Sequence, residues 1–252
     1  MKTMRFSRTQ KQILAYTGVL SAILGIPAGV SAMHIMEGYL PASHCIAWGI
    51  LCIPFLLAGF MSISRTLREH RNLITLFAMS GAYIFVISSL KIPSITGSCS
   101  HMTGTGLGAI LFGPSAVSLL GVIVLLFQAL LLAHGGLTTL GANTFSMAVA
   151  GPFVSYGIYF VCGKLKMNKK LSVFLAAALG DLTTYCVTAA QMAPAHHTDT
   201  TVIGAFGKFL LVFAPTQLPL AVVEGLLTVL IVMALETYAR PELRASGYLE
   251  VQ

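Results

Sequence analysis

Charged residues are scarce in this chain: only 9% of its 252 residues are Asp, Glu, Lys or Arg. Hydrophobic residues make up 56% of it, and the mean hydropathy is +0.84. A soluble domain of ordinary composition carries about 25% charged residues, so this composition excludes one. The sequence predicts an all-α, polytopic membrane protein, a helical bundle in which each crossing takes about 20 apolar residues.

Paired cysteines and the common catalytic motifs are also absent. The five cysteines include no CxxC pair, so neither a disulfide framework nor a thiolate zinc site is indicated. The chain has no Walker A sequence, no HExxH motif and no Ser/His/Asp arrangement that would support an ATPase or a hydrolase. We therefore expect a protein that is not an enzyme and has no cofactor, and any uphill transport would take its energy from a partner or an ion gradient.

The net charge of +7 does not indicate a nucleic-acid partner, because it is concentrated at the amino terminus. Four basic residues open the chain: Lys2, Arg5, Arg8 and Lys11. An apolar stretch at 13–26 and the small residues of 30–32 follow. This order is typical of a secretory signal peptide over residues 1–32, with cleavage between Ala32 and Met33. An uncleaved amino-terminal anchor helix is the alternative.

Seven apolar stretches follow the signal, at residues 43–63, 73–90, 104–111, 115–133, 140–162, 171–191 and 214–235. The third is shorter than a crossing helix and is separated from the fourth by Gly113 and Pro114. Counting it as a crossing places the lysines of 164–170 on the same side as the carboxyl terminus, as the positive-inside rule requires. We expect about seven transmembrane helices, the third short or broken, with the mature amino terminus outside and the carboxyl terminus in the cytoplasm.

Cleavage after Ala32 would make His34 the second residue of the mature chain. The terminal amine of Met33, the amide nitrogen of His34 and its imidazole then close fused five- and six-membered rings on one metal ion. Planar nitrogen donors are typical of Ni(II) or Cu(II) sites, and one position stays open. His101 is the candidate fourth donor, because its loop lies on the same outer side. A lone interfacial histidine is the alternative for His101.

Four residues are candidates for supporting or pathway roles. Glu37 is close enough to the terminus to accept a hydrogen bond from a ligand N–H, and Ser100 adjoins His101. Asn143 and Glu224 lie in apolar spans and should face the bundle interior, as should the other polar residues of the spans, Gln128, Asp181 and Gln217.

The remaining histidines favour a structural interpretation. His44 and His70 have no metal-site context, and His134, followed by two glycines, is typical of a turn. His196 and His197 are either an outer metal-collecting patch or part of a solvated loop.

Four stretches resemble the CbiM family of cobalt transport proteins: MHIMEGYLP (33–41), KIPSITGSCSH (91–101) with TGTGLG (103–108), AHGGLTTLGANTFSM (133–147), and QLPLA (217–221) through EGLLT (224–228). The resemblance covers nearly all of residues 33–252, which we therefore expect to form a single membrane-embedded metal-binding transport domain. One departure is Met102, which stands where the family pattern Ser-His-Pro-Thr-Gly has proline.

This resemblance implies the substrate-specific component of a cobalt or nickel energy-coupling factor transporter, in a bacterial plasma membrane. Implied partners are a small membrane subunit, a transmembrane coupling subunit and cytoplasmic ATPase subunits, with cobalt supplied for cobalamin synthesis. The implied metal ligands are Met33, His34 and His101. Alternatives are a nickel-specific component, a membrane metalloenzyme using His101 with His196 or His197, and a gradient-driven carrier using Asp181 and Glu224.

Overall fold

The computed structural model describes residues 34–93, 99–197 and 201–248. The chain divides into two units, residues 1–30 and 31–252, and every described residue belongs to the second. The expected signal peptide, its cleavage site at Ala32 and the proposed ligand Met33 therefore lie outside the described residues.

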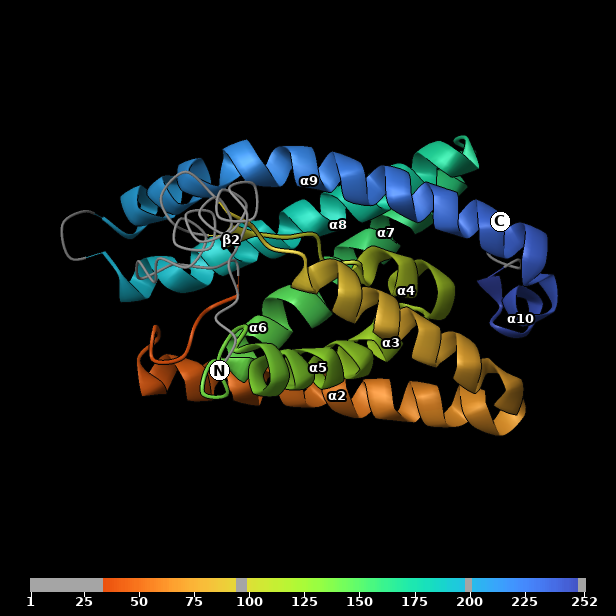
Figure 1. Ribbon diagram of the computed structural model, residues 1–252, viewed down its shortest axis with the longest axis horizontal. Helices are drawn as coiled ribbons and strands as arrows, with labels where there is room; N and C mark the ends of the chain where they lie inside the picture. Colours follow the sequence, from red (N-terminus) through yellow and green to blue (C-terminus); the bar gives the residue numbers. More distant parts are fainter. Residues whose placement is uncertain (1–33, 94–98, 198–200, 249–252) are drawn as a thin grey trace, which may run out of the picture. The chain divides into compact units, whose positions relative to one another are not determined.

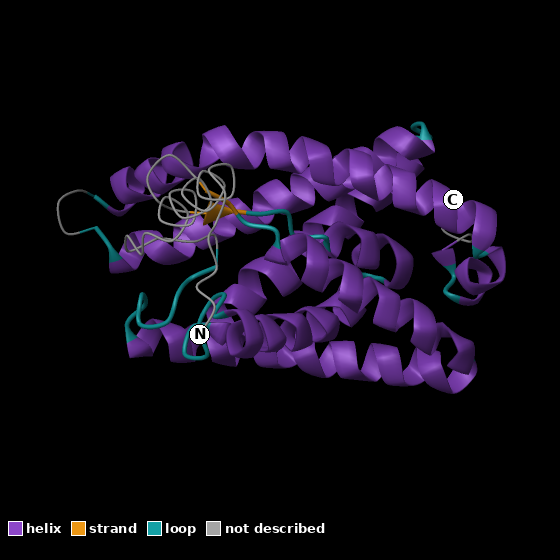
Figure 2. Ribbon diagram, viewed as in Figure 1, coloured by secondary structure: helices purple, strands orange, loops and turns teal. Residues whose placement is uncertain are grey.

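The described residues are mostly helical (Figure 2). In chain order the elements are α2 (Ala42–Glu69), the short 3-10 helix η1 (Arg71–Leu73), α3 (Ile74–Ser89), strands β1 (Ile92–Pro93) and β2 (Cys99–Ser100), α4 (Thr105–Phe112), α5 (Pro114–Leu132), α6 (Leu140–Asn143), the π-helix η2 (Thr144–Ala150), α7 (Gly151–Lys164), α8 (Lys169–Met192), the 3-10 helix η3 (Ala193–Ala195), α9 (Val202–Tyr238) and α10 (Arg240–Ala245). The two strands pair antiparallel, with Ile92 opposite Ser100. The all-α prediction is confirmed, since each strand has only two residues.

Six stretches of helix in the described part of the chain are long and apolar enough to cross a membrane: 42–69, 71–89, 114–132, 140–164, 169–195 and 202–238. The predicted third stretch is the eight-residue helix α4, which at about 1.5 Å per residue is too short to cross alone. It ends at Phe112 and is followed by Gly113, whose φ of 83° favours glycine, and α5 begins at Pro114. The expectation of a short helix broken at this pair is confirmed.

The distribution of polar and apolar side chains is that of a protein surrounded by lipid. Large apolar residues point outward along α2, where Ile46 and Ile50 are each 62% exposed. Carboxyl and amide groups lie inside instead, and Asp181, Gln217 and Glu224 are each 0% exposed. Because water-soluble proteins have the opposite arrangement, the outer surface is suited to acyl chains.

Helix α4 lies inside the bundle, between α3, α5, α7 and α8 (Figure 1). Its residues from Thr105 to Leu111 are all buried. Close packing requires its glycines, because a Cβ at Gly106 would lie 2.9 Å from the Cα of Ala177 in α8. A broken helix at membrane depth is tolerated only where protein surrounds its free backbone groups, and α4 is surrounded in this way.

Helix α9 is longer than the predicted stretch 214–235. Its 37 residues begin at Val202, where Thr201 caps the helix by accepting a hydrogen bond from the Gly204 N–H, 3.1 Å away. Pro215 and Pro219 lie inside the helix. Each proline removes one backbone hydrogen bond, yet neighbouring helices permit such prolines within a membrane bundle.

Candidate metal centre

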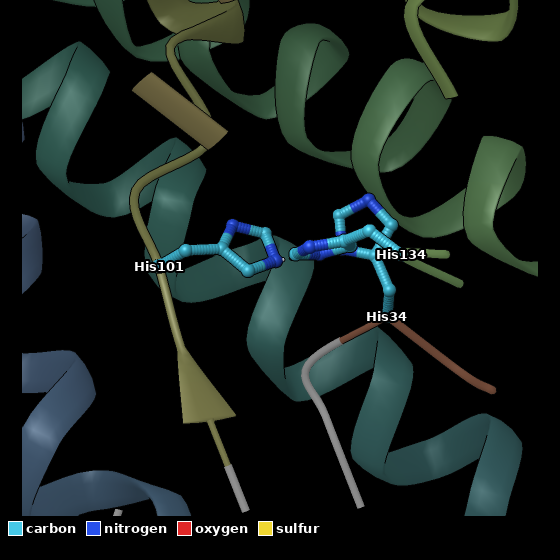
Figure 3. Close-up of side chains that lie close together, drawn as sticks. All are labelled: His34, His101 and His134. Atoms are coloured by element: carbon cyan, nitrogen blue, oxygen red, sulfur yellow. Dashed lines mark hydrogen bonds between the residues drawn. The ribbon is translucent and has the colours of Figure 1, made fainter. Parts of the chain in front are cut away.

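Three histidines from separate connecting segments meet inside the bundle (Figure 3). His34 precedes α2, His101 follows β2, and His134 lies between α5 and α6. The backbone that presents His134 turns sharply: Ala133 ends α5 in the left-handed region with φ of 47°, and Gly135 has φ of 78°. Such a turn directs His134 back toward the other two imidazoles.

The three imidazoles are buried and close together. His34 Nδ1 lies 2.6 Å from His101 Nε2. The ring of His134 lies edge-on to that of His34, with centroids 4.4 Å apart. One ligand atom from each of the three residues lies within 4.8 Å of the others. Nitrogen atoms at this spacing are suitable donors for one transition-metal ion.

Hydrogen bonds indicate which nitrogen of His101 and of His34 faces the centre. His101 Nδ1 lies 2.9 Å from the carbonyl oxygen of Met102, which can only accept, so Nδ1 carries the proton and Nε2 presents a lone pair. His34 Nδ1 then donates its hydrogen to that lone pair in the ion-free protein. A metal bound between the two would take the lone pair of His34 Nδ1, with the ring proton moved to His34 Nε2.

Burial keeps all three imidazoles neutral. It lowers the pKa of His34 well below the ordinary value, and neighbouring His134 and His101 lower it further. Burial likewise lowers the pKa of His101 and of His134. Since only the neutral imidazole binds a metal, the site is in its metal-binding state at neutral pH.

Asn143 fixes the backbone immediately after His34. Its Oδ1 accepts a hydrogen bond from Ile35 N at 2.7 Å, and its Nδ2 donates to Ile35 O at 3.0 Å. Thr139 Oγ1 donates to the same carbonyl at 2.6 Å. The structure thus brings Asn143 beside the histidines, where it positions the His34 segment.

Glu37 lies near the site but contacts no histidine ring in the described structure. Its exposed carboxylate accepts hydrogen bonds from the backbone N–H of Thr138, at 3.2 Å, and from the Thr138 hydroxyl. These bonds lower the pKa of Glu37. A Cβ on Gly136 would lie 2.6 Å from the Cα of Glu37, so the segment carrying His134 packs directly on the segment carrying His34.

Ser100 and Glu224 contact the segment that carries His101. Ser100 Oγ lies 2.7 Å from Thr216 Oγ1 of α9. The Glu224 carboxylate accepts hydrogen bonds from Thr103 and Gly104. Both predicted supporting residues therefore act through the backbone of this segment and do not touch the imidazoles.

His134 is the residue of the cluster that sequence reasoning assigned to a turn. It does follow a turn, but its ring is 1% exposed, and neither ring nitrogen has a hydrogen-bond partner among the described residues. The two glycines after it were the available signal, because they permit close approach to other backbone.

Other histidines lie away from the centre. His70 is exposed, and His44 is half-buried next to Ser43. His196 and His197 are exposed and bond to the backbone carbonyls of Tyr39 and Pro194. The structure does not bring His196 or His197 to His101, which the metalloenzyme alternative required.

The pocket beside the imidazoles is too small for a hydrated ion. It is lined by His34, His101, Asn143, Ser146, Met147 and Thr184, and it has no room for a water molecule. An ion that binds here exchanges its water shell for protein donors.

Fold and site together define a multi-pass membrane protein with a buried nitrogen-donor site suited to a late first-row transition metal. The chain belongs to the CbiM family, described as the cobalt uptake substrate-specific transmembrane region, whose model matches residues 34–243. Among curated relatives, the cobalt transport protein CbiM of Lachnoclostridium phytofermentans is 63% identical over 242 residues, covering 96% of this chain and 97% of the relative. That of Chlorobium limicola is 60% identical over 219 residues, covering 86% of each.

Two solved structures share the fold. The chain in a crystal structure of a transition metal transporter has 30% sequence identity to this chain and a TM-score of 0.71. The match covers 81% of this chain and 92% of the other. A truncated transition metal transporter is 29% identical, with a TM-score of 0.70, over 81% of this chain and 99% of the other. The chain is thus a component of a cobalt transporter in a membrane and not an enzyme, and cobalt is its cargo.

Proposed function

We propose that this chain is the ion-capturing subunit of an ATP-dependent Co²⁺ importer of the energy-coupling factor type, which supplies cobalt for cobalamin synthesis. Its partners are a small membrane subunit, a transmembrane coupling subunit and cytoplasmic ATPase subunits. The absence of a Walker A sequence from the chain supports an energy source in a separate subunit. In a bacterial plasma membrane the mature amino terminus lies outside and the carboxyl terminus in the cytoplasm.

Four nitrogen atoms hold the ion in this proposal: the amine of Met33, the amide nitrogen of His34 after it has released its proton to solvent, His34 Nδ1 and His101 Nε2. The observation that carries it is the 2.6 Å between the last two atoms. Adjacent donors of a square plane with metal–nitrogen bonds of about 2.0 Å are about 2.8 Å apart. Nδ1 is also the ring atom that closes a six-membered chelate with the amide of the same residue.

The proposal requires removal of residues 1–32, because only a free amine at Met33 completes the plane. Residues 33–252 then form one transport domain. The Ile35 N–H is already bonded to Asn143 Oδ1 at 2.7 Å. The amide nitrogen of His34 is therefore the last one along the chain that can bind the ion. Nickel is the alternative cargo, since nitrogen donors generally bind it more tightly than cobalt. The preference for cobalt derives from the relatives.

Uptake of radioactive cobalt by cells that express the transporter tests the ligand set. His34→Ala and His101→Ala are each expected to abolish accumulation, because each removes a donor that the remaining protein cannot replace. His70→Ala, which changes an exposed histidine in the turn after α2, is the matched control and should accumulate cobalt normally. Normal uptake by His34→Ala or His101→Ala would refute the ligand assignment.

The terminal amine is tested separately, by acetylating the amine of Met33 in the processed chain. An acetylated nitrogen no longer donates to a metal, the five-membered ring is lost, and cobalt binding to the purified chain should weaken strongly. Unchanged binding would exclude the amine as a donor. Loss of the ATPase subunit distinguishes the gradient-driven alternative, in which transport would continue.

A further inference from the structure

A cluster of buried polar side chains on α8 and α9 lies beside the His101 segment. Asp181, Gln217 and Glu224 are each 0% exposed. In the described part of the chain, no Lys or Arg forms a salt bridge with either carboxyl group. Burying such groups in a membrane bundle is unfavourable unless other contacts compensate, so the contacts of this cluster identify its role.

The carboxylate of Glu224 accepts hydrogen bonds from two backbone N–H groups shortly after His101, those of Thr103 and Gly104. Its Oε2 accepts a hydrogen bond from Thr103 N at 2.6 Å, and its Oε1 accepts from Thr103 Oγ1 and Gly104 N, each at 2.9 Å. Gly104 directly precedes α4, so the carboxylate lies where the helix dipole favours negative charge. Hydrogen bonds to a charged acceptor are stronger than neutral ones.

Gln217 holds the same segment two residues earlier, at His101. Its Nε2 donates to the carbonyl oxygen of His101, 3.2 Å away, and to Asp181 Oδ2, 2.5 Å away. Both amide hydrogens are therefore used, and Asp181 fixes the orientation of the amide. Helix α9 thus bonds to the backbone at residues 101, 103 and 104.

Asp181 and Glu224 adjoin each other. Asp181 Oδ1 has no donor elsewhere in the described structure. Two bare carboxylates in contact would repel strongly, so one proton shared between them is the simplest arrangement. The single remaining negative charge is then matched by the three donors from Thr103 and Gly104.

We propose that Glu224 is a positioning residue for the metal site, which holds His101 in its metal-binding position through the Thr103–Gly104 backbone. This inference rests on the proposed function, in which His101 is a ligand. Gln217, which bonds to the carbonyl of His101, lies between Pro215 and Pro219, and Glu224 follows them on the same helix.

Dissociation of Co²⁺ from the purified, amino-terminally processed full chain in lipid nanodiscs tests the proposal. The chain is loaded with Co²⁺ and then mixed with excess chelator, and the visible spectrum reports the bound ion. Glu224→Gln keeps the side-chain volume but faces an NH₂ group toward N–H donors. It is expected to release Co²⁺ about 10- to 100-fold faster, as expected from losing hydrogen bonds to a charged group.

Two further variants separate positioning from general destabilisation. Ser155→Ala removes a buried hydrogen bond to Ala176 O, 2.9 Å long, between α7 and α8, and should leave the release rate unchanged. Thr103→Val removes one of the three donors and should accelerate release by a smaller factor, whereas Thr103→Ser keeps the hydroxyl and should behave as wild type. If Glu224→Gln fails to fold, the comparison of Thr103→Val with Thr103→Ser still tests whether these hydrogen bonds slow the release of Co²⁺.

Wild-type release rates in both Glu224→Gln and Thr103→Val would overturn the proposal, as would equal acceleration by Ser155→Ala. Retained binding in His101→Ala would instead refute the proposed ligand set. The two failures are therefore distinguishable in one set of measurements.

Discussion

Replacement of Asn143 by alanine should weaken metal binding through the backbone of Ile35. Ile35 is 1% exposed, and Asn143 supplies the acceptor for its N–H and one of two donors to its carbonyl. Leaving a buried donor unpaired costs about 1–3 kcal/mol, and the lost bond to the carbonyl adds about 1 kcal/mol. If the ion-free chain relieves this cost by a shift of the His34 segment that the loaded chain cannot make, the smallest combined effect, about 2 kcal/mol, corresponds to about a 30-fold increase in the Kd for Co²⁺.

Equilibrium dialysis of Co²⁺ against the purified mature chain measures this effect. Asn168→Ala is the matched control: Asn168 is an exposed helix cap that accepts from Lys170 N at 2.9 Å, so its loss should cost about 1 kcal/mol of stability and leave the Kd unchanged. A wild-type Kd in Asn143→Ala would refute the reasoning that Asn143 positions His34. Equal weakening by both variants would show that affinity follows general stability.

Two further predictions concern the contact between the His34 and His134 segments. Gly136→Ala places a Cβ 2.6 Å from the Cα of Glu37 and should raise the Kd about tenfold or more by dialysis, whereas Gly157→Ala, with nothing within 4 Å, should not. Because bonds from Thr138 lower the pKa of Glu37, its contribution to stability is present above the unfolded-state pKa of about 4.3 and disappears as the pH falls through the folded-state pKa. The difference in Tm between wild type and Glu37→Gln should therefore vanish in acid, and a difference that persists or grows there would contradict the assignment.

Much of the fold follows from length and charge. Apolar stretches of about 20 residues predicted the crossing helices. The loop lysines of 164–170 favoured a third stretch separate from the fourth, and α4 and α5 are separate helices. What these rules do not determine is where a helix starts outside the apolar stretch. α9 begins at Val202, well before the predicted residue 214, because a threonine cap and protein contacts support its first turns.

The site was predictable where chemistry is local and less so where it depends on packing. His34 and His101 were identified from position relative to a terminus and a loop, and the structure brings them together. His134 was not identified, because its approach depends on the left-handed turn at Ala133 and on Gly136 packing against Glu37. Glu224 was identified only as a buried acid, since nothing in its own stretch reveals that its partners are Thr103 and Gly104.

The three histidines lie in connecting segments far apart along the chain, and His101 comes 67 residues after His34. An ion held between His34 and His101 is therefore a crosslink that ties the segment before α2 to the segment between β2 and α4. The unfolded chain keeps the donors of Met33 and His34 but does not hold His101 beside them, so the bound ion favours the folded state, by at most about 2.7 kcal/mol at a free concentration 100 times the Kd. In a cell with ample cobalt, the loaded chain would resist unfolding and proteolysis, so the supply of the cargo would also set the lifetime of the protein that carries it.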